Sequence, residues 1–432
     1  MKKKIYLIGA GGAGMSAVAK YLYKEGYSVS GSDAAHSETI IDLQENYGFD
    51  YKGDHDANNI QVSQEAIIYT PAVGPGNPEY DKAVALQMKM YSYPEFIGVI
   101  SENKRTIAIA GTNGKTTTTT MVGEVLVNAG LDPTIIVGGV MTAFGTNYKE
   151  GNSDLFVVEA CEYKNSFLSL SPETLVITNI TPDHLDFFKT VENYKQVFVE
   201  FVKKMSVGNT LICNQGDPEL IEVIFQAKKQ GINIIDYTDL NKPELQIPGS
   251  HNVQNAQAAL AVGHVYGVQV KNAQTYLEHS FKGSGRRFEY RGDTHEHHQV
   301  FDDYAHNPEA IETLVTGIRE RYPKIHIVMF FQPHLFSRTQ DLFIEFVRTL
   351  GLVDTQIVLP IYRAREEDDG SMSSIILSEA IRIEHPSVNV SSPNNFKEAV
   401  DIFKNLKLPK DTIVLTVGAG DVNKIADMLL EE

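Results

Sequence analysis

The sequence RTIAIAGTNGKTTTTT, from Arg105 to Thr120, joins an apolar run to a glycine loop and a threonine-rich segment. The apolar run predicts a strand, and the segment after Lys115 predicts a helix. In such a loop, backbone N–H groups and a lysine can hold phosphates, while the hydroxyl of Thr116 can reach Mg²⁺. Ile109 stands where the usual phosphate loop has its first glycine. The stretch therefore predicts an α/β unit with a phosphate-binding turn.

A second glycine loop lies near the amino terminus. Gly9, Gly11 and Gly14 form G-x-G-x-x-G between a predicted strand and a predicted helix. Glycines in this context let the backbone approach a pyrophosphate at a helix N-terminus. Asp33 ends the next predicted strand, which suits NAD when taken alone. A nucleotide diphosphate in general is better supported than nicotinamide, and a tight turn without a ligand stays open as an alternative.

Two apolar strands of the central block end in acidic and imidazole groups. VVEACEY ends with Glu159 and Glu162, and TNITPDHLD carries Asp183 and His184. Ligands of an open parallel sheet bind beyond the carboxyl ends of the strands. A carboxylate and an imidazole beside Thr116 suit Mg²⁺ that bridges a nucleotide and a second substrate. Solvated loop acids are the alternative interpretation.

Four further segments add polar groups at predicted strand ends or helix starts. A guanidinium at such a place can hold a carboxylate bidentately. The four segments are, in chain order, SHNVQNAQAAL, GSGRRFEY, DDYAHNP and FQPHLFSRT. The first supplies His251 and Asn252, the second Arg286 and Arg287, the third Asp303, Tyr304 and His306, and the fourth His334 and Arg338. The tract HEHH resembles a metal-binding run but falls at the expected tip of a hairpin, so we predict a solvated turn there.

Composition limits the classes of function. Of 432 residues, 42% are hydrophobic and 22% are charged, as in a globular protein, and the net charge is −17. A nucleic-acid or membrane binder needs a basic face, so we expect neither partner. The two cysteines are too few for a disulfide framework. With no signal peptide and no apolar run long enough for a membrane helix, the sequence predicts a cytoplasmic protein.

The order of elements predicts three α/β domains. Short apolar runs alternate with helical stretches up to about residue 101, the pattern restarts at Arg105, and a third set begins after Arg287. We expect domains at residues 1–102, 103–288 and 289–432. The length of the chain agrees with three domains.

The motifs together resemble the Mur ligases. The resemblance runs nearly end to end, and it is closest to the members that attach L-alanine to UDP-N-acetylmuramate. The segments that carry it are GAGGAGMS, GSD, TPAVGPGNPE, AGTNGKTTTT, VEACEY, TNITPDHLD, HNVQNAQAA, GRRFE, DDYAH, FQPH, SRT and GAGD.

The resemblance implies a fold and an activity. We expect an N-terminal Rossmann-like domain for the UDP-sugar, a central P-loop ATPase-like domain with a parallel sheet, and a C-terminal Rossmann-like domain for the amino acid. The diphosphate at the first glycine loop then belongs to UDP. The expected reaction uses ATP and Mg²⁺ to make an acyl phosphate of UDP-N-acetylmuramate, which the amine of L-alanine attacks. A monomer or homodimer is expected.

Carried over by motif, the resemblance also implies the site residues. The catalytic group is Lys115, Glu159, His184 and His306. The ATP-binding group is Gly111, Thr112, Asn113, Gly114, Lys115, Thr116, Thr117, Asn252, Arg287 and Asp303. The UDP-sugar group is Gly9, Gly11, Gly12, Gly14, Met15, Ser16, Asp33 and Glu162. The amino-acid group is Tyr304, His306, His334 and Arg338, and the Mg²⁺ ligands are Thr116, Glu159 and His184.

Three alternatives stay open at this point. The first is a murein tripeptide ligase that uses the same UDP-sugar and differs in the C-terminal pocket. The second is an NAD-dependent oxidoreductase, which leaves the phosphate loop unexplained. The third is a non-catalytic sensor of UDP-sugar or ATP.

Overall fold

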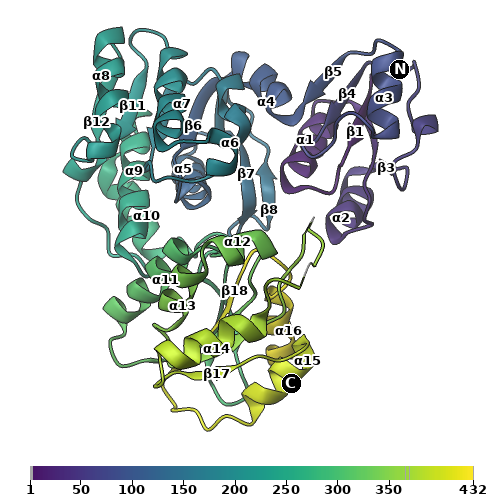
Figure 1. The fold of residues 1–432 in the computed structure, drawn as a ribbon. Coiled ribbons are helices and arrows are strands. Elements are labelled where there is room, and N and C mark those ends of the chain that lie inside the picture. The colour runs from purple at the N-terminus through teal and green to yellow at the C-terminus, as the bar shows by residue number, and fades with distance from the viewer. Residues whose placement is uncertain (1–2, 365, 369, 432) are drawn as a thin grey trace. The chain divides into compact units, whose positions relative to one another are not determined.

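The computed structural model describes residues 3–364, 366–368 and 370–431, and it alternates helices with strands throughout (Figure 1). Within those ranges the strands form three sheets of five, seven and six strands. This confirms the predicted α/β architecture. By contact, the chain divides into two compact units: the first runs to Glu244 and includes Val253–Phe281, and the second comprises Leu245–Asn252 and the chain from Lys282. The domain boundaries at 102/103 and 288/289 stay a prediction.

The N-terminal sheet is parallel throughout, with the strand order β3-β2-β1-β4-β5. Its central strand β1 buries four consecutive residues, because helices cover both faces of such a sheet. The elements are β1 (Lys4–Ile8), α1 (Ala13–Lys24), β2 (Ser28–Ser32), α2 (Glu38–Tyr47), β3 (Asp50–Tyr51), β4 (Ala66–Tyr69), α3 (Pro78–Ala85), β5 (Met90–Ser92) and α4 (Tyr93–Glu102).

The central sheet has the order β12-β11-β10-β6-β9-β7-β8 and belongs to the same unit. It is parallel except at one edge, where β7 and β8 pair antiparallel. The elements are β6 (Arg105–Ala110), α5 (Lys115–Asn128), β7 (Thr134–Met141), β8 (Thr146–Lys149), β9 (Leu155–Glu159), β10 (Thr174–Ile177), α6 (Leu185–Phe188), α7 (Val191–Lys203), β11 (Thr210–Cys213), α8 (Ile221–Gln230), β12 (Asn233–Asp236), α9 (Ser250–Val265) and α10 (Val270–His279).

Strand β8 was not expected from the sequence, because the letters TNYK form no apolar run. The strand nevertheless positions the first glycine loop. The Asn147 side-chain amide donates to the Ala13 carbonyl at 2.5 Å and to the Ser16 hydroxyl at 3.0 Å. The antiparallel edge of the central sheet therefore contacts the start of α1.

The C-terminal sheet lies in the second unit and has the order β13-β14-β18-β15-β16-β17. Its strands pair in parallel except for the hairpin β13–β14. The elements are β13 (Glu289–Asp293), β14 (Gln299–Asp303), α11 (Pro308–Arg321), β15 (His326–Phe331), α12 (Phe336–Asp341), α13 (Phe343–Leu350), β16 (Thr355–Val358), α14 (Ser374–Glu384), β17 (Asn389–Ser391), α15 (Phe396–Lys404), β18 (Thr412–Val417) and α16 (Asn423–Leu430).

The hairpin confirms the turn predicted for HEHH, but the prediction that the whole tract is solvated is wrong, because His298 leads directly into β14 and is only 3% exposed. His295 and Glu296 form the turn, and the Thr294 N–H donates to the His298 carbonyl at 2.9 Å. Over the part of the chain that the structure describes, no helix is both long and apolar enough to cross a membrane.

Candidate active site

The phosphate loop connects β6 to α5, as the sequence predicted. Gly111 and Gly114 have φ angles of +130° and +83°, which side chains rarely tolerate. A Cβ at Gly111 would lie 2.1 Å from the Thr178 hydroxyl, and one at Gly114 would lie 2.4 Å from the Asn255 side-chain oxygen. Both conformation and space therefore require glycine at these two positions.

Asn179 holds the first half of this loop. The Thr112 N–H donates to its carbonyl, and the Asn113 N–H donates to its side-chain oxygen, each at 3.0 Å. The Asn179 amide in turn donates to the Asn113 carbonyl at 3.0 Å. Two of the loop N–H groups assigned to phosphate thus point at Asn179, and the helix start at Lys115 and Thr116 is the part of the loop left for an anion.

Thr116 and Glu159, two of the predicted Mg²⁺ ligands, lie side by side. The Thr116 hydroxyl donates to the two carboxylate oxygens of Glu159 at 2.9 and 3.0 Å, and the Gly138 N–H donates to Glu159 at 2.8 Å. The pair presents oxygen donors, which Mg²⁺ prefers. The residues present therefore fit the metal that the family resemblance implies.

His184, the third predicted ligand, caps α6 with a φ of +52°. Its ring contacts the ring of Tyr163, with centroids 4.6 Å apart. Because Tyr163 directly follows the segment that carries Glu159 and Glu162, this contact joins the two loops that the sequence predicted to meet.

Lys115 lies at the start of α5 with its ammonium directed back into the loop. Burial alone would lower the pKa of Lys115, but attraction to the carboxylates of Glu162 and Glu159 raises it above the ordinary value. The side chain therefore stays charged, as a phosphate ligand must.

The first glycine loop is shaped by Asp33. The carboxylate of Asp33 accepts from the Gly11 N–H at 2.8 Å and from the Ala35 N–H at 3.1 Å. Asp33 therefore stabilises the loop itself. Met15 is buried in the core, so any contact of this residue with a ligand is through its backbone.

Tyr93 is a residue near this loop that the sequence motifs did not reveal. A Cβ at Gly14 would lie 2.7 Å from the Tyr93 ring, so the third glycine of the motif makes room for an aromatic side chain. Burial, followed by the nearby Glu159 carboxylate, raises the pKa of Tyr93. A lone tyrosine at the start of a helix carries no recognisable pattern, and only its packing identifies it.

In the second unit, the other three residues assigned to the amino acid lie around His306. Its ring lies 5.3 Å from that of Tyr304 and 6.2 Å from that of His334, and Arg338 is 3.5 Å from the His334 Nδ1. Burial, together with the charges of Arg338 and Arg287, lowers the pKa of His306 to about 4. The imidazole is therefore neutral near pH 7, with its Nδ1 2.9 Å from the Tyr304 carbonyl.

Two other predicted ATP residues are engaged within the second unit. The Asp303 carboxylate accepts from the Phe288 and Ala305 N–H groups at 2.7 and 2.8 Å, and burial raises the pKa of Asp303 although Arg287 opposes this. The Asn252 amide donates to the Pro248 carbonyl at 2.6 Å. Both side chains thus order their own loops, and their contacts with a nucleotide stay a prediction.

Arg286 is a second residue that no site assignment included. Its guanidinium donates to Asp302 at 2.9 Å and to the carbonyls of Gly418 and Gly420 at 2.6 and 3.0 Å. It therefore fixes the GAGD loop after β18. The guanidinium carbons of Arg286 and Arg287 lie 5.2 and 5.0 Å from the centre of the Tyr304 ring.

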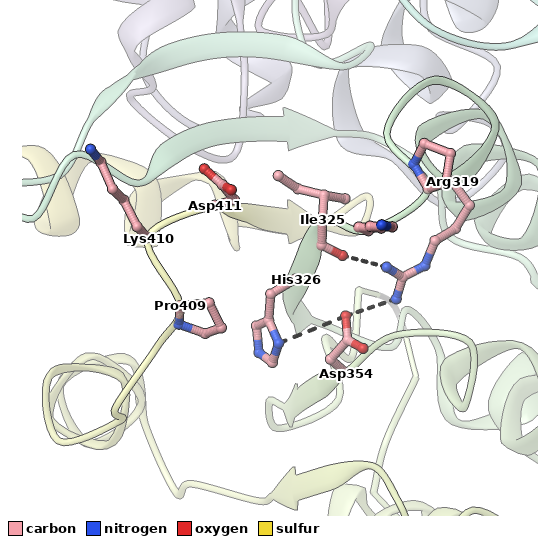
Figure 2. A pocket seen from close by; sticks show the side chains of 9 residues that line it. Arg319, Ile325, His326, Asp354, Pro409, Lys410 and Asp411 are labelled. Atoms are coloured by element: carbon pink, nitrogen blue, oxygen red, sulfur yellow. Dashed lines mark hydrogen bonds and ion pairs between the residues drawn. The ribbon is translucent and has the colours of Figure 1, made fainter.

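A pocket of about 390 Å³ lies away from these residues, at the amino ends of β15 and β18 (Figure 2). In Figure 2, Arg319 reaches Asp354, at 2.7 Å, and the Ile325 carbonyl. Ligands of open α/β sheets bind at the opposite, carboxyl ends of the strands, where His334 and the GAGD loop follow β15 and β18. The pocket therefore does not belong to the candidate site.

Three family profiles cover most of the chain. The Mur ligase family catalytic domain matches residues 4–105, the Mur ligase middle domain matches residues 109–243, and the Mur ligase glutamate ligase domain matches residues 286–420. The three matches follow the order of the three sheets.

Curated relatives extend the likeness over the whole chain. The UDP-N-acetylmuramate--L-alanine ligase of Clostridium perfringens is 37% identical over 100% of this chain and 98% of its own. The enzyme of the same name from Clostridium acetobutylicum is 38% identical with the same coverage.

Solved structures agree. The UDP-N-acetylmuramate-alanine ligase MurC from Thermotoga maritima superposes with a TM-score of 0.80 at 27% identity, over 99% of this chain and 98% of that one. A murein peptide ligase from Psychrobacter arcticus has the same fold, with a TM-score of 0.69 at 22% identity. Sequence motifs, site geometry and full-length relatives thus agree that the chain belongs to the Mur ligase family.

Proposed function

We propose that this Mur ligase joins L-alanine to the lactyl carboxylate of UDP-N-acetylmuramate at the expense of ATP. The observation that carries the proposal is the loop Gly111–Thr117, whose lysine and threonine face the carboxylates of Glu162 and Glu159. Relatives that are 35–38% identical over the full chain carry the name of this activity. The reaction belongs to peptidoglycan precursor synthesis, and we place it in the cytoplasm.

Each proposed domain receives one substrate. Residues 1–102 bind the UDP-sugar through the loop Gly9–Ser16, residues 103–288 bind ATP through the phosphate loop, and residues 289–432 bind the amino acid. Thr116, Glu159 and His184 hold Mg²⁺, which supplies charge neutralisation for the transferred phosphoryl group.

The chemistry starts from a poor electrophile. A carboxylate oxygen of the substrate attacks the γ-phosphorus of ATP, ADP leaves, and an acyl phosphate results. Lys115 stabilises the negative charge that spreads over the transferred group and keeps that group in line with the attacking oxygen.

The amine of L-alanine then attacks the acyl carbon, and the tetrahedral intermediate collapses to an amide and inorganic phosphate. We assign the carboxylate of the amino acid to Arg338 and His334, because a guanidinium binds a carboxylate through two parallel hydrogen bonds. The Nδ1 of His306 faces the Tyr304 carbonyl, which leaves Nε2 of the neutral imidazole to accept a hydrogen bond from the amine. His306 therefore orients the nucleophile and can take its proton.

The test is phosphate release from ATP with UDP-N-acetylmuramate, measured with L-alanine, glycine, L-serine and the murein tripeptide in turn. We expect release to depend on the UDP-sugar and to be fastest with L-alanine. A preference for the tripeptide would replace this function by the recycling ligase. Release that needs no UDP-sugar would overturn the proposal altogether.

A further inference from the structure

The Lys115 ammonium is held by three acceptors of the protein. Its Nζ lies 2.6 Å from the Gly111 carbonyl, 2.9 Å from the Thr112 carbonyl and 3.0 Å from the Glu162 carboxylate. An ammonium has three N–H donors, so these contacts use its whole capacity. A phosphoryl oxygen can therefore bind Lys115 only by displacing one of the three.

Glu162 is poorly placed to contact the UDP-sugar, the role assigned to it by sequence. The residue is 1% exposed, and its carboxylate accepts from the Tyr194 hydroxyl at 3.3 Å besides pairing with Lys115. A buried carboxylate loses a large hydration energy unless a cation compensates it. Its surroundings thus direct Glu162 at the lysine.

Tyr194 connects this ion pair to the rest of the loop. The tyrosine lies on α7, is fully buried, and its hydroxyl is 2.7 Å from the Thr112 hydroxyl. Thr112 also donates to the Thr181 carbonyl at 2.8 Å and accepts from the Thr181 N–H at 2.9 Å. One buried network therefore spans the phosphate loop, the lysine counter-ion and the segment that leads to His184.

We propose that Glu162 is a positioning residue that holds the Lys115 ammonium at its working place, and that Tyr194 holds Glu162. The inference rests on the proposed function, in which Lys115 binds the transferred phosphoryl group. A hydrogen bond between two ions is stronger than one to a neutral carbonyl. An incoming phosphoryl oxygen therefore replaces the Gly111 or Thr112 carbonyl, and Glu162 keeps its contact.

This arrangement separates a positioning role from a structural one. A residue that only supports the fold would, when replaced, lower stability and leave the rate per folded molecule in place. Glu162 contacts the Lys115 ammonium at 3.0 Å, so its loss should lower kcat with little change in KM for ATP.

The experiment compares two substitutions in the network with two matched controls. Glu162→Gln and Tyr194→Phe change one charge and one hydroxyl without altering shape. The buried Glu124 and the half-buried Tyr276 form a second glutamate–tyrosine pair, at 2.9 Å, so Glu124→Gln and Tyr276→Phe are the same changes outside the network. For each variant we measure kcat and KM for ATP, and the Kd for ATP by calorimetric titration.

We expect Glu162→Gln to lower kcat about tenfold or more. KM for ATP should change less than about threefold, because the lost interaction serves the transition state. Tyr194→Phe should lower kcat by roughly threefold to tenfold, since a neutral hydrogen bond contributes less than a charge pair. Both controls should stay within about twofold of the parent.

An unchanged kcat in Glu162→Gln would overturn the proposal, and so would equal losses in the control pair. If Glu162→Gln does not fold, an unchanged kcat in Tyr194→Phe overturns it instead. If the parent protein shows no release that depends on UDP-sugar, the proposed function has failed. A crystal structure of the Glu162→Gln variant then still tests whether Glu162 holds the Lys115 ammonium, and an ammonium that keeps its place would overturn the proposal.

Discussion

Glu162 and Glu124 are equally buried, and each accepts a hydrogen bond from a tyrosine, yet their surroundings differ. Both are 1% exposed. Glu162 faces the Lys115 ammonium at 3.0 Å. Glu124 has the Tyr276 hydroxyl at 2.9 Å, and the described residues supply no partner for its Oε1. Burial raises the pKa of Glu124 to about 7, although the hydrogen bond from Tyr276 opposes it.

The difference shows what a buried carboxylate needs in order to serve a reaction. At the start of α5 an ammonium compensates the charge, so the carboxylate can direct a cation toward phosphate. Further along the same helix, the residues that the structure describes place no cation beside Glu124, and burial favours the neutral form of this acid. A buried ion pair adds little net stability, so its presence at the phosphate loop points to function.

The largest expected effect comes from removing the cation of the first pair. Lys115→Met should lower kcat for phosphate release by about a thousandfold or more, because the transferred group loses its counter-charge. It should also leave Glu162 as a buried carboxylate without a neighbouring cation, as Glu124 is. This should lower the free energy of unfolding by about 3 kcal/mol at pH 8. Urea denaturation across pH 5 to 9 measures this change. Adding Glu162→Gln should restore stability without activity, and a double variant as unstable as the single one would contradict the comparison.

Glu124→Gln should remove the pH dependence that the second pair confers. The folded-state pKa of Glu124, about 7, lies above its ordinary value of 4.5, so the unfolded chain releases its proton first and stability falls as pH rises between these values. The loss is about 3 kcal/mol above pH 7, and the glutamine variant should escape it. Urea denaturation at pH 4.5, 6 and 8 gives the slope. Equal slopes in variant and parent would show that Glu124 is ionised in the folded protein.

His306 extends the comparison to a half-buried base. Its pKa of about 4 lies below the ordinary 6.5, so stability is present above pH 6.5 and is lost as pH falls toward 4, the opposite sign to Glu124. His306→Gln should flatten that acid-side loss and raise KM for L-alanine about tenfold, the cost of one hydrogen bond to a charged group. Steady-state kinetics and urea denaturation test the two effects separately. An unchanged KM would remove His306 from the amino-acid site.

The smallest expected effect is that of Tyr276→Phe. Loss of the hydroxyl leaves the Glu124 carboxyl without its partner and should lower the free energy of unfolding by about 1 kcal/mol at pH 6. The rate of phosphate release should not change, since this pair lies outside the network around Lys115. Thermal denaturation and kcat, measured on the same sample, test these two expectations. If kcat falls as far as in Tyr194→Phe, the pair Glu124–Tyr276 affects the reaction as much as the pair Glu162–Tyr194 does, which would contradict the comparison.

Much of the fold and of the candidate site could be predicted from short sequence patterns. Apolar runs placed the strands around Ile107, and glycines with a following lysine placed the phosphate loop, because backbone conformation and phosphate binding depend on neighbouring residues. Strand β8 escaped prediction, since its TNYK sequence has no apolar alternation and its register comes from β7. Tyr93 escaped because one residue alone forms no motif, and Arg286 was named among the polar groups of GSGRRFEY but its role in fixing the GAGD loop depends on contacts more than 130 residues away in the chain.

The sequence by itself determined the α/β class, the order of the motifs and the family, since each depends on residues that are close together or on their order along the chain. Tertiary structure decided what the buried acids do. Glu162 follows a predicted strand, and Glu124 lies in a predicted helix. Nothing in the residues next to either glutamate indicates whether it is a counter-ion or a neutral acid. The difference arises because Tyr194, 82 residues beyond Thr112, closes a network around Lys115, whereas no cation packs beside Glu124 among the residues that the structure describes.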